Sequence, residues 1–187
     1  MPCNIIETDL PGAVILEPTV YEDPRGFFME TYNAGPDSHG LLNTHFVQDN
    51  LSLSQQGVIR GLHYQHPSPQ GKLVQVLKGE VFDVAVDLRQ GSPTFKKWIG
   101  VNLSDSNHRQ FYIPEGFAHG FAVLSETALF FYKCSDYYAP ACERGVNYAD
   151  PQINIHWPVE TPLLSEKDAA LPMLKDIPAD YLPKFEG

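Results

Sequence analysis

The stretch EVFDVAVDL (residues 80–88) decides the fold class, because apolar and acidic side chains alternate along it. Successive side chains of a β-strand point to opposite faces. The even-numbered positions from Phe82 to Leu88 are apolar, whereas Asp83 and Asp87 stand at odd-numbered positions. The pattern predicts a strand with one packed face and one face that carries carboxylates.

Short runs rich in β-branched and aromatic residues recur along most of the chain, separated by Gly, Pro, Asn and Ser. No long helical stripe lies between them, which favours an antiparallel sandwich or barrel over a βαβ fold. We therefore predict an all-β fold. The expected strands span residues 13–20, 26–31, 45–54, 58–65, 73–77, 80–88, 95–103, 109–113, 120–124 and 127–134.

The chain has 187 residues, a length typical of one domain with a substantial core. We expect a single domain over residues 1–187, with its core at about 14–157. The tail, residues 158–187, is irregular, and SEKDAAL (165–171) is its clearest short helical piece. We find no internal repeat or linker that divides the chain.

The formal net charge of −10 argues against some classes of partner. Nucleic acids and anionic membranes need a broad basic surface, so neither is expected. The start of the chain lacks the charged and apolar regions of a signal peptide, and no apolar run approaches the roughly 20 residues of a membrane span. Three cysteines without a CxxC pair predict neither a disulfide framework nor a zinc knuckle. These features predict a cytoplasmic protein.

Two histidines in VIRGLHYQHP (58–67) raise the question of a metal site. In a metal-binding barrel, His-x-His places both rings on one face of a strand, where they meet one ion. Here His63 and His66 are three residues apart, so that they point to opposite faces of a strand, and Pro67 follows directly. IPEGFAHGF (113–121) keeps the turn of the second half of such a barrel signature. We therefore predict a barrel without a metal site, with His66 in a loop.

The surroundings of His63 favour a lined cavity over an isolated core histidine, because polar side chains are dense nearby. Gln48 and Asn50 lie on one strand face by alternation. Arg60 and His63 fall on opposite faces of a regular strand. A bulge at Gly61 would reset that alternation and bring them to the same face.

Several motifs, taken in order along the chain, resemble those of one family. They are FVQDN (46–50), RGLHYQ (60–65), QGKLV (70–74), IPEGFAHGF (113–121), FFYKCSDYYAP (130–140) and LSEKDAA (164–170). From about Val14 to Leu171 the chain resembles the dTDP-4-dehydrorhamnose 3,5-epimerases, which are cupin-fold enzymes of deoxysugar biosynthesis. The resemblance implies a cupin-type double-stranded β-helix, or jelly-roll barrel, with a few short helices that are mainly C-terminal.

The resemblance implies an isomerase that inverts C3 and C5 of dTDP-4-dehydro-6-deoxy-D-glucose to give dTDP-4-dehydro-L-rhamnose. Both carbons flank the C4 carbonyl, so loss of either proton gives an enolate. Such a reaction needs a base, an acid on the opposite face and a cation or donor near the C4 oxygen, and it needs neither a redox cofactor nor a metal. The family pattern assigns the base to His63, the acid to Tyr132, the partner of His63 to Asp168 and the enolate-stabilising cation to Lys72. It places His119 in the same pocket.

Each assignment has a simpler structural alternative. SEKD (165–168) also fits a helix-capping motif, which its spacing alone favours. Tyr132 in LFFYK is typical of core packing when the family pattern is set aside. Lys72 follows a glycine and fits a solvated turn lysine. Asp83 is placed to orient His119 from the neighbouring strand, but its alternation favours an exposed carboxylate.

The resemblance also implies a nucleotide subsite, since a pyrophosphate needs local cations even on an acidic protein. The substrate-binding residues that it implies are Arg25, Glu30, Gln48, Asp49, Asn50, Arg60, His119, Tyr138, Glu143 and Lys167. Tyr138, or its neighbour Tyr137, is expected to stack on the thymine. In the family the N-terminal strand crosses to the partner subunit, so Arg25 and Glu30 are expected to complete the other chain's site in a homodimer. The alternative is that DPRG (23–26) is a turn with a solvated arginine.

Two other functions share this signature. Relatives that epimerise only C3 or only C5 in antibiotic-sugar pathways keep much of it. A cupin that binds a sugar nucleotide or a metal, and has no isomerase activity, keeps the fold. Gln75 departs from the pattern, because a basic residue is common there in relatives, but it lies outside the expected acid–base set.

Overall fold

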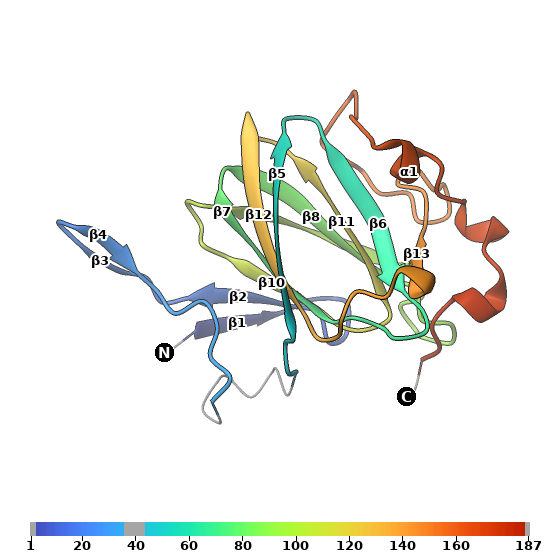
Figure 1. Ribbon diagram of the computed structural model, residues 1–187, viewed down its shortest axis with the longest axis horizontal. Coiled ribbons are helices and arrows are strands. Elements are labelled where there is room, and N and C mark those ends of the chain that lie inside the picture. Colours follow the sequence, from blue (N-terminus) through green and yellow to red (C-terminus); the bar gives the residue numbers. More distant parts are fainter. Residues whose placement is uncertain (1–2, 36–43, 186–187) are drawn as a thin grey trace.

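A computed structural model of the chain describes residues 3–35 and 44–185, which are mostly β-strand with a few short helical turns late in the sequence (Figure 1). The strands are β1 (Cys3–Glu7), β2 (Val14–Pro18), β3 (Tyr21–Asp23), β4 (Gly26–Phe28), β5 (Gln48–Gln55), β6 (Ile59–Gln65), β7 (Lys72–Lys78), β8 (Glu80–Asp87), β9 (Trp98–Ser104), β10 (Gln110–Ile113), β11 (Phe117–Val123), β12 (Thr127–Cys134) and β13 (Glu143–Gly145). The helical segments are η1 (Pro140–Cys142), α1 (Glu166–Ala169), η2 (Leu174–Asp176) and η3 (Ala179–Tyr181).

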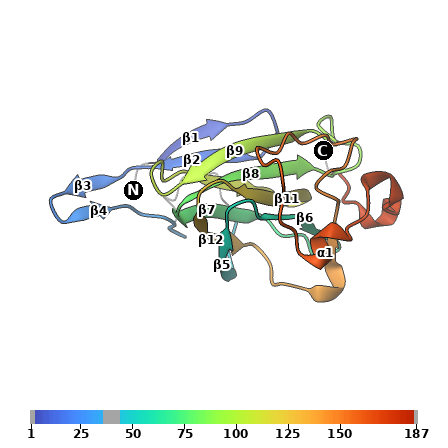
Figure 2. The ribbon, with the colours of Figure 1, turned by 90° about the horizontal axis from the view of Figure 1, so that it is seen from above.

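The strands form two facing sheets and a separate hairpin (Figure 2). One sheet has the order β1-β2-β10-β7-β12-β5 and the other the order β13-β6-β11-β8-β9, with antiparallel neighbours in both. From β5 to β8, and again from β9 to β13, the chain alternates between the two sheets. In the described ranges the sheets share no strand, so the barrel is not closed by hydrogen bonds. The predicted all-β, cupin-type jelly roll is confirmed.

Two hydrophobic clusters hold this fold together. The first lies between the sheets and includes the fully buried Phe111 and Phe130. The second lies on the outer face of the five-stranded sheet, where Leu62 packs with Leu174 and Leu182 of the C-terminal tail. Because the tail covers this face, the five-stranded sheet is buried on both sides.

Strand β8 differs from the expectation based on its alternation. Its odd-numbered positions point into the space between the sheets, so Asp83 and Asp87 are both 0% exposed. Asp87 accepts hydrogen bonds from Arg89, Ser92 and Thr94. The prediction of exposed carboxylates on this face was wrong, because the opposite sheet covers it and the tail covers the other face.

Most of the expected strands are present, with ends shifted by a few residues. The sequence did not predict β1, β3 and β13, which have only three to five residues each. The expected range for β11 also began at Gly120 instead of Phe117, which left His119 outside the strand. Short strands carry too little periodic pattern to be recognised before their partners are known.

The β3–β4 hairpin projects from the barrel on the side opposite α1, and both views agree on this (Figures 1 and 2). All residues of both strands are exposed, including Phe27 at 57% and Phe28 at 63%. The Phe27 ring lies 4.7 Å from that of His108, which anchors one side of the hairpin. We call residues 21–28 the arm.

The tail holds the expected helical piece. Helix α1 begins after Ser165, whose Oγ accepts a hydrogen bond of 3.0 Å from the amide of Asp168. The helix lies within the predicted range 165–171. In the described part of the chain, none of the helices is both long enough and apolar enough to cross a membrane.

Candidate active site

Strand β6 carries Arg60 and His63 on either side of an irregularity at Gly61. Across the sheet Arg60 pairs with Phe121 and His63 pairs with His119, so the register shifts between the two pairs. Gly61 has a φ of 119°, and a Cβ at this position would lie 2.7 Å from the backbone of β11. Only glycine tolerates both conditions. The predicted bulge at Gly61 is confirmed.

His63 is hydrogen-bonded to Asp168, with 2.7 Å between Nε2 and Oδ1. The two side chains are 31% and 7% exposed. Burial alone raises the pKa of Asp168, but the bond and charge of His63, with bonds from Gly61 and Ser165, lower it below its ordinary value. The ionised carboxylate therefore accepts the Nε2–H, which leaves the lone pair of His63 on Nδ1. The capping and pairing roles coexist, because Ser165 bonds the amide of Asp168 while His63 bonds its carboxylate.

A polar cavity of about 320 Å³ lies beside His63, between the two sheets. This volume is within the range of small-molecule sites, about 300–1,000 Å³. Its lining side chains are Gln48, Asn50, His63, Tyr64, Gln65, Gln70, Lys72, Tyr132, Cys134, Tyr138 and Glu143. The structure therefore brings three of the expected catalytic residues, His63, Lys72 and Tyr132, to one cavity.

Burial shifts the pKa of two of these groups. It raises the pKa of Tyr132, and the charge of Arg60 offsets this only in part, so the phenol keeps its proton at neutral pH. Burial also lowers the pKa of Lys72, which is 9% exposed, while nearby negative groups such as Asp83 oppose that change. Among the residues that the structure describes, Nζ of Lys72 has no hydrogen-bond partner. It is free to bind an oxygen in the cavity.

A second histidine–carboxylate pair lies next to the first. Nε2 of His119 is 2.9 and 3.1 Å from the two carboxylate oxygens of Asp83, and the His119 ring stacks on Phe130. Burial lowers the pKa of His119, although Asp83 opposes this. One expectation needs correction here, because Asp83 is not exposed but orients His119. His119 pairs with His63 across the sheet and is 7% exposed, and its place in the same pocket stays a prediction.

Tyr138, Glu143 and Lys167 form a chain of hydrogen bonds on the exposed side of the cavity. Tyr138 Oη and Lys167 Nζ each donate to Glu143 over 2.6 Å. Burial alone raises the pKa of Glu143, but these two bonds lower it overall. Gln48 accepts from the Tyr138 amide and donates to Asn50, each over 2.9 Å. These five predicted residues therefore form one connected group.

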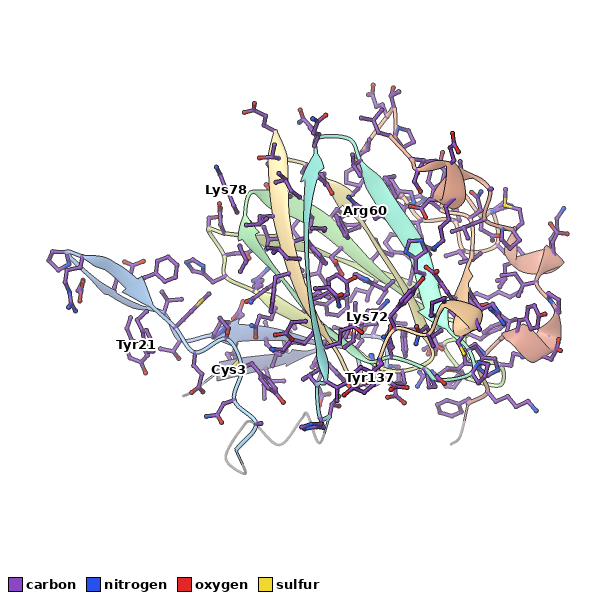
Figure 3. All side chains as sticks on the ribbon, in the orientation of Figure 1. Cys3, Tyr21, Arg60, Lys72, Lys78 and Tyr137 are labelled. Carbon is purple, nitrogen blue, oxygen red and sulfur yellow. The ribbon has the colours of Figure 1, made fainter. Side chains whose placement is uncertain are left out.

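Arg60 lies at the exposed start of β6, where its Nε donates to Ser54 Oγ over 2.9 Å. Figure 3 shows Arg60 and Lys72 on the side of the molecule formed by β5 and β6, away from Tyr21 on the arm. Arg60 does not line the cavity, but it is near enough for its charge to act on Tyr132.

Three other predicted substrate-binding residues lie away from the cavity. Asp49 points to the opposite face of β5 from its two neighbours and pairs with Lys133 over 2.8 Å, so one copy of the chain does not bring it to its own cavity. Arg25, whose side chain is 90% exposed, lies on the arm, and Glu30 follows the arm directly. Within the described ranges Arg25 pairs with Asp23 alone. One copy of the chain does not bring Arg25 and Glu30 to its own cavity.

His66 follows β6 in a loop, as predicted, and lines a different cavity together with Pro67 and Arg89. Across residues 3–35 and 44–185, no group of three His, Cys, Asp or Glu side chains is placed to hold a metal ion.

Comparison with known proteins gives this site a family. A model of the dTDP-4-dehydrorhamnose 3,5-epimerases matches residues 7–176. The chain belongs to the dTDP-4-dehydrorhamnose 3,5-epimerase family. An enzyme of that name from Shigella flexneri is 54% identical over 180 residues, which cover 95% of this chain and 98% of the relative. The resemblance inferred from the motifs is confirmed, and the chain is an isomerase.

Solved structures of epimerases share the fold along nearly the whole chain. A dTDP-6-deoxy-D-glucose-3,5-epimerase from Legionella pneumophila, in complex with dTDP-4-keto-L-rhamnose, has a TM-score of 0.96 and 55% identity, and all of both chains is covered. A 3'-monoepimerase from Streptomyces bikiniensis, in complex with dTDP-quinovose, has a TM-score of 0.87 and 33% identity, with 96% of this chain and 92% of that one covered. One fold therefore serves both 3,5-epimerases and a mono-epimerase.

Sequence reasoning assigned no role to four residues that line the cavity of this epimerase. They are Tyr64, Gln65, Gln70 and Cys134, although the first three were among the polar residues near His63 that suggested a cavity. Gln65 follows His63 by two positions and Cys134 follows Tyr132 by two, so strand alternation was a usable signal for both. Gln70 lies in a loop, where alternation gives no information.

Proposed function

We propose that this chain, acting as one domain, inverts C3 and C5 of dTDP-4-dehydro-6-deoxy-D-glucose to form dTDP-4-dehydro-L-rhamnose. The observation that carries the proposal is the oriented His63–Asp168 pair in a polar cavity that also holds Tyr132 and Lys72. Each of the two carbons is next to the C4 ketone, so removal of its proton is assisted by delocalisation onto the C4 oxygen. The chemistry requires a base, an acid and a stabilising cation, and the cavity offers one residue of each kind.

His63 is the base in this proposal. Its Nδ1 lone pair takes the proton from C3 or C5, and the electrons of the C–H bond form the enolate. Asp168 holds the ring in the tautomer that leaves Nδ1 free, and its negative charge stabilises the imidazolium that results. The low pKa of Asp168 keeps this carboxylate charged throughout the neutral range.

Tyr132 supplies the proton on the other face of the sugar, and Lys72 stabilises the enolate oxygen. Burial keeps the Tyr132 phenol protonated before the reaction, as a proton donor requires. The Lys72 ammonium, 9% exposed and free of hydrogen-bond partners within the described ranges, is available to the C4 oxygen. In a cavity with little water, such a charge acts more strongly than it does in solution.

The nucleotide is held by the connected group on the exposed side of the cavity. Tyr138, which is 51% exposed, offers a ring face for the thymine. Gln48 and Asn50 offer amides along the inner face of β5, and Arg60 offers a guanidinium for the pyrophosphate. Glu143, with its partner Lys167, borders the sugar side.

A homodimer completes each site in this proposal. The arm extends away from its own barrel, so Arg25 and Glu30 have a role at a nucleotide only if they reach a second copy of the chain. The outer face of β5 supports such a contact, because Leu51 and Leu53 are 59% and 65% exposed, and Leu77 of β7, beyond β12 in the same sheet, is 45% exposed. Exposed apolar patches of this kind typically mark protein interfaces.

The test is NMR of the enzyme with the 4-keto sugar nucleotide in deuterated water. The proposal predicts deuterium at both C3 and C5 in the product. Label at only one of the two carbons would move the assignment to a mono-epimerase. Absence of exchange at both carbons, with the nucleotide still bound, would identify a cupin that binds sugar nucleotides without epimerising them.

A further inference from the structure

The loop of residues 136–139 follows β12 and carries both exposed tyrosines of the site. Tyr137 and Tyr138 are 66% and 51% exposed, and neither belongs to a strand or helix. The loop therefore lacks a sheet ladder to hold its backbone. Its order has to come from other contacts.

Glutamine side chains from the barrel supply these contacts. Gln65 of β6, which is 5% exposed, accepts from the Ala139 amide over 2.8 Å and donates to the Tyr137 carbonyl over 3.3 Å. Its amide nitrogen also donates to the Ser68 carbonyl over 2.9 Å. The side chain thus uses both of its ends, and it ties the loop to the strand that carries His63.

Two more glutamines bond the same loop from other elements. Gln70, in the connection between β6 and β7, donates to the Asp136 carbonyl over 2.8 Å. Gln48 of β5 accepts from the Tyr138 amide over 2.9 Å. Four backbone groups of residues 136–139 are therefore held by glutamine side chains. We call Gln48, Gln65 and Gln70 the glutamine clamp.

We propose that Gln65 and Gln70 are positioning residues that fix the 136–139 loop, and with it the Tyr138 ring, in the geometry that receives the nucleotide base. This inference rests on the proposed function, because it assumes that Tyr138 contacts the base. Gln65 and Gln70 act at one remove from the chemistry, since their bonds run to backbone groups and not to Tyr132 or Lys72.

The position of Tyr138 also affects the positions of its hydrogen-bonded neighbours in the site. Tyr138 Oη donates to Glu143, which is also bonded by Lys167. A loop free to move would displace this hydrogen-bonded chain as well as the ring. Loss of the clamp should therefore weaken nucleotide binding while it leaves the proton-transfer step intact.

Gln65→Met tests the proposal, because methionine has a similar length and volume but cannot make the three hydrogen bonds. The expected result is a rise of about tenfold in the Kd for dTDP and in KM, with kcat at saturating substrate within about twofold of wild type. Amide hydrogen exchange at Ala139 should accelerate in the same variant. Gln56→Met is the control for the same substitution, since the exposed Gln56 side chain bonds the Leu124 carbonyl away from the cavity, and it should leave all these values unchanged.

If exchange at Ala139 accelerates in Gln65→Met while the Kd for dTDP is unchanged, the clamp is only a structural feature and the proposal is overturned. Unchanged amide exchange at Ala139 in this variant would also overturn it. If Gln65→Met fails to fold, Gln70→Met, which removes one bond only, decides by the same Kd and by exchange within the loop. A wild-type protein that binds dTDP but does not exchange the sugar protons would refute the proposed function and not the clamp, because both clamp measurements need no turnover. A wild-type protein that does not bind dTDP would refute both.

Discussion

The cavity and the arm are opposites in how their functional side chains are held. In the cavity, His63 is oriented by Asp168, Glu143 is bonded from two sides, and the 136–139 loop is held by glutamines. On the arm, Arg25 is 90% exposed and pairs only with its near neighbour Asp23 among the described residues.

This difference indicates which parts of the site one chain can build alone. Side chains that perform chemistry need fixed positions, and the barrel provides them through buried partners from distant strands. An exposed arginine on a projecting hairpin has no such support in its own chain. We therefore expect the barrel to set the rate of the chemical step and the arm to contribute binding energy to a neighbouring copy.

Removal of the base should give the largest effect. His63→Ala should lower kcat by about 10³-fold or more, because His63 is the one histidine among the described residues that line the cavity. The Kd for dTDP should change by less than about twofold, since His63 acts on the sugar and not on the nucleotide. Steady-state kinetics and calorimetry measure the two values.

His66→Ala is the matched control, because His66 lines a different cavity. Equal losses in both variants would remove the basis for assigning His63 as the base.

Disruption of the proposed interface should give the next largest effect. Leu53→Glu places a charge in the exposed apolar patch of β5, so it should convert dimers to monomers and lower kcat/KM by about 10²-fold. Light scattering and kinetics at matched concentrations measure both changes. Leu163→Glu is the control, since Leu163 is similarly exposed at 52% but lies on the tail. A variant that is monomeric and fully active would contradict the composite site.

Arg25→Ala should have a smaller effect than loss of the whole interface. We expect KM to rise about tenfold, the loss typical of one charge-assisted contact to a phosphate, while Tm and dimerisation stay unchanged. Lys97→Ala removes another exposed cation, just before β9, and should leave KM unaltered. Matching KM values for wild type and Arg25→Ala would show that the arm has no part in the site.

The smallest expected effect concerns the pH dependence of stability. The pKa of His119 is lowered by burial, so the unfolded chain takes up a proton at this position before the folded protein does. Stability is therefore retained above the ordinary histidine pKa of about 6.5 and decreases as the pH falls through it.

His119→Gln keeps a donor for Asp83 but does not titrate. Its Tm should fall less between pH 7.5 and 5.5 than that of the wild type, by a few °C, since 1 kcal/mol corresponds to about 2–4 °C at this size. Parallel slopes of Tm against pH for the two proteins would refute this origin of the acid sensitivity.

Much of the fold could be predicted from the sequence because strand alternation is local information. The ten expected strands are present, and the bulge at Gly61 was inferred from the conflict between Arg60 and His63. Asp83 was misplaced because alternation reports two faces but not what covers them. The cover is the opposite sheet, which the sequence around Asp83 does not specify.

The site was predictable to the extent that its motifs are distinctive. His63, Tyr132, Lys72 and Asp168 meet as the family pattern implied, although more than 100 residues separate the first from the last. Gln65 and Gln70 counted among the polar residues near His63, but their role was not predicted because their partners are backbone groups of a loop without a periodic pattern. The catalytic and binding roles of the predicted site residues, like the cytoplasmic location, stay predictions.

Subunit complementation tests most directly whether the cavity and the arm of one chain serve different sites. His63→Ala and Arg25→Ala chains, each impaired alone, are unfolded together, refolded and assayed at a substrate concentration well below KM. The account predicts recovery to about a quarter of the wild-type activity, because half of the dimers are mixed and each mixed dimer has one intact site of two. Activity no higher than the average of the two separate variants would show that Arg25 and His63 do not belong to sites built by two chains.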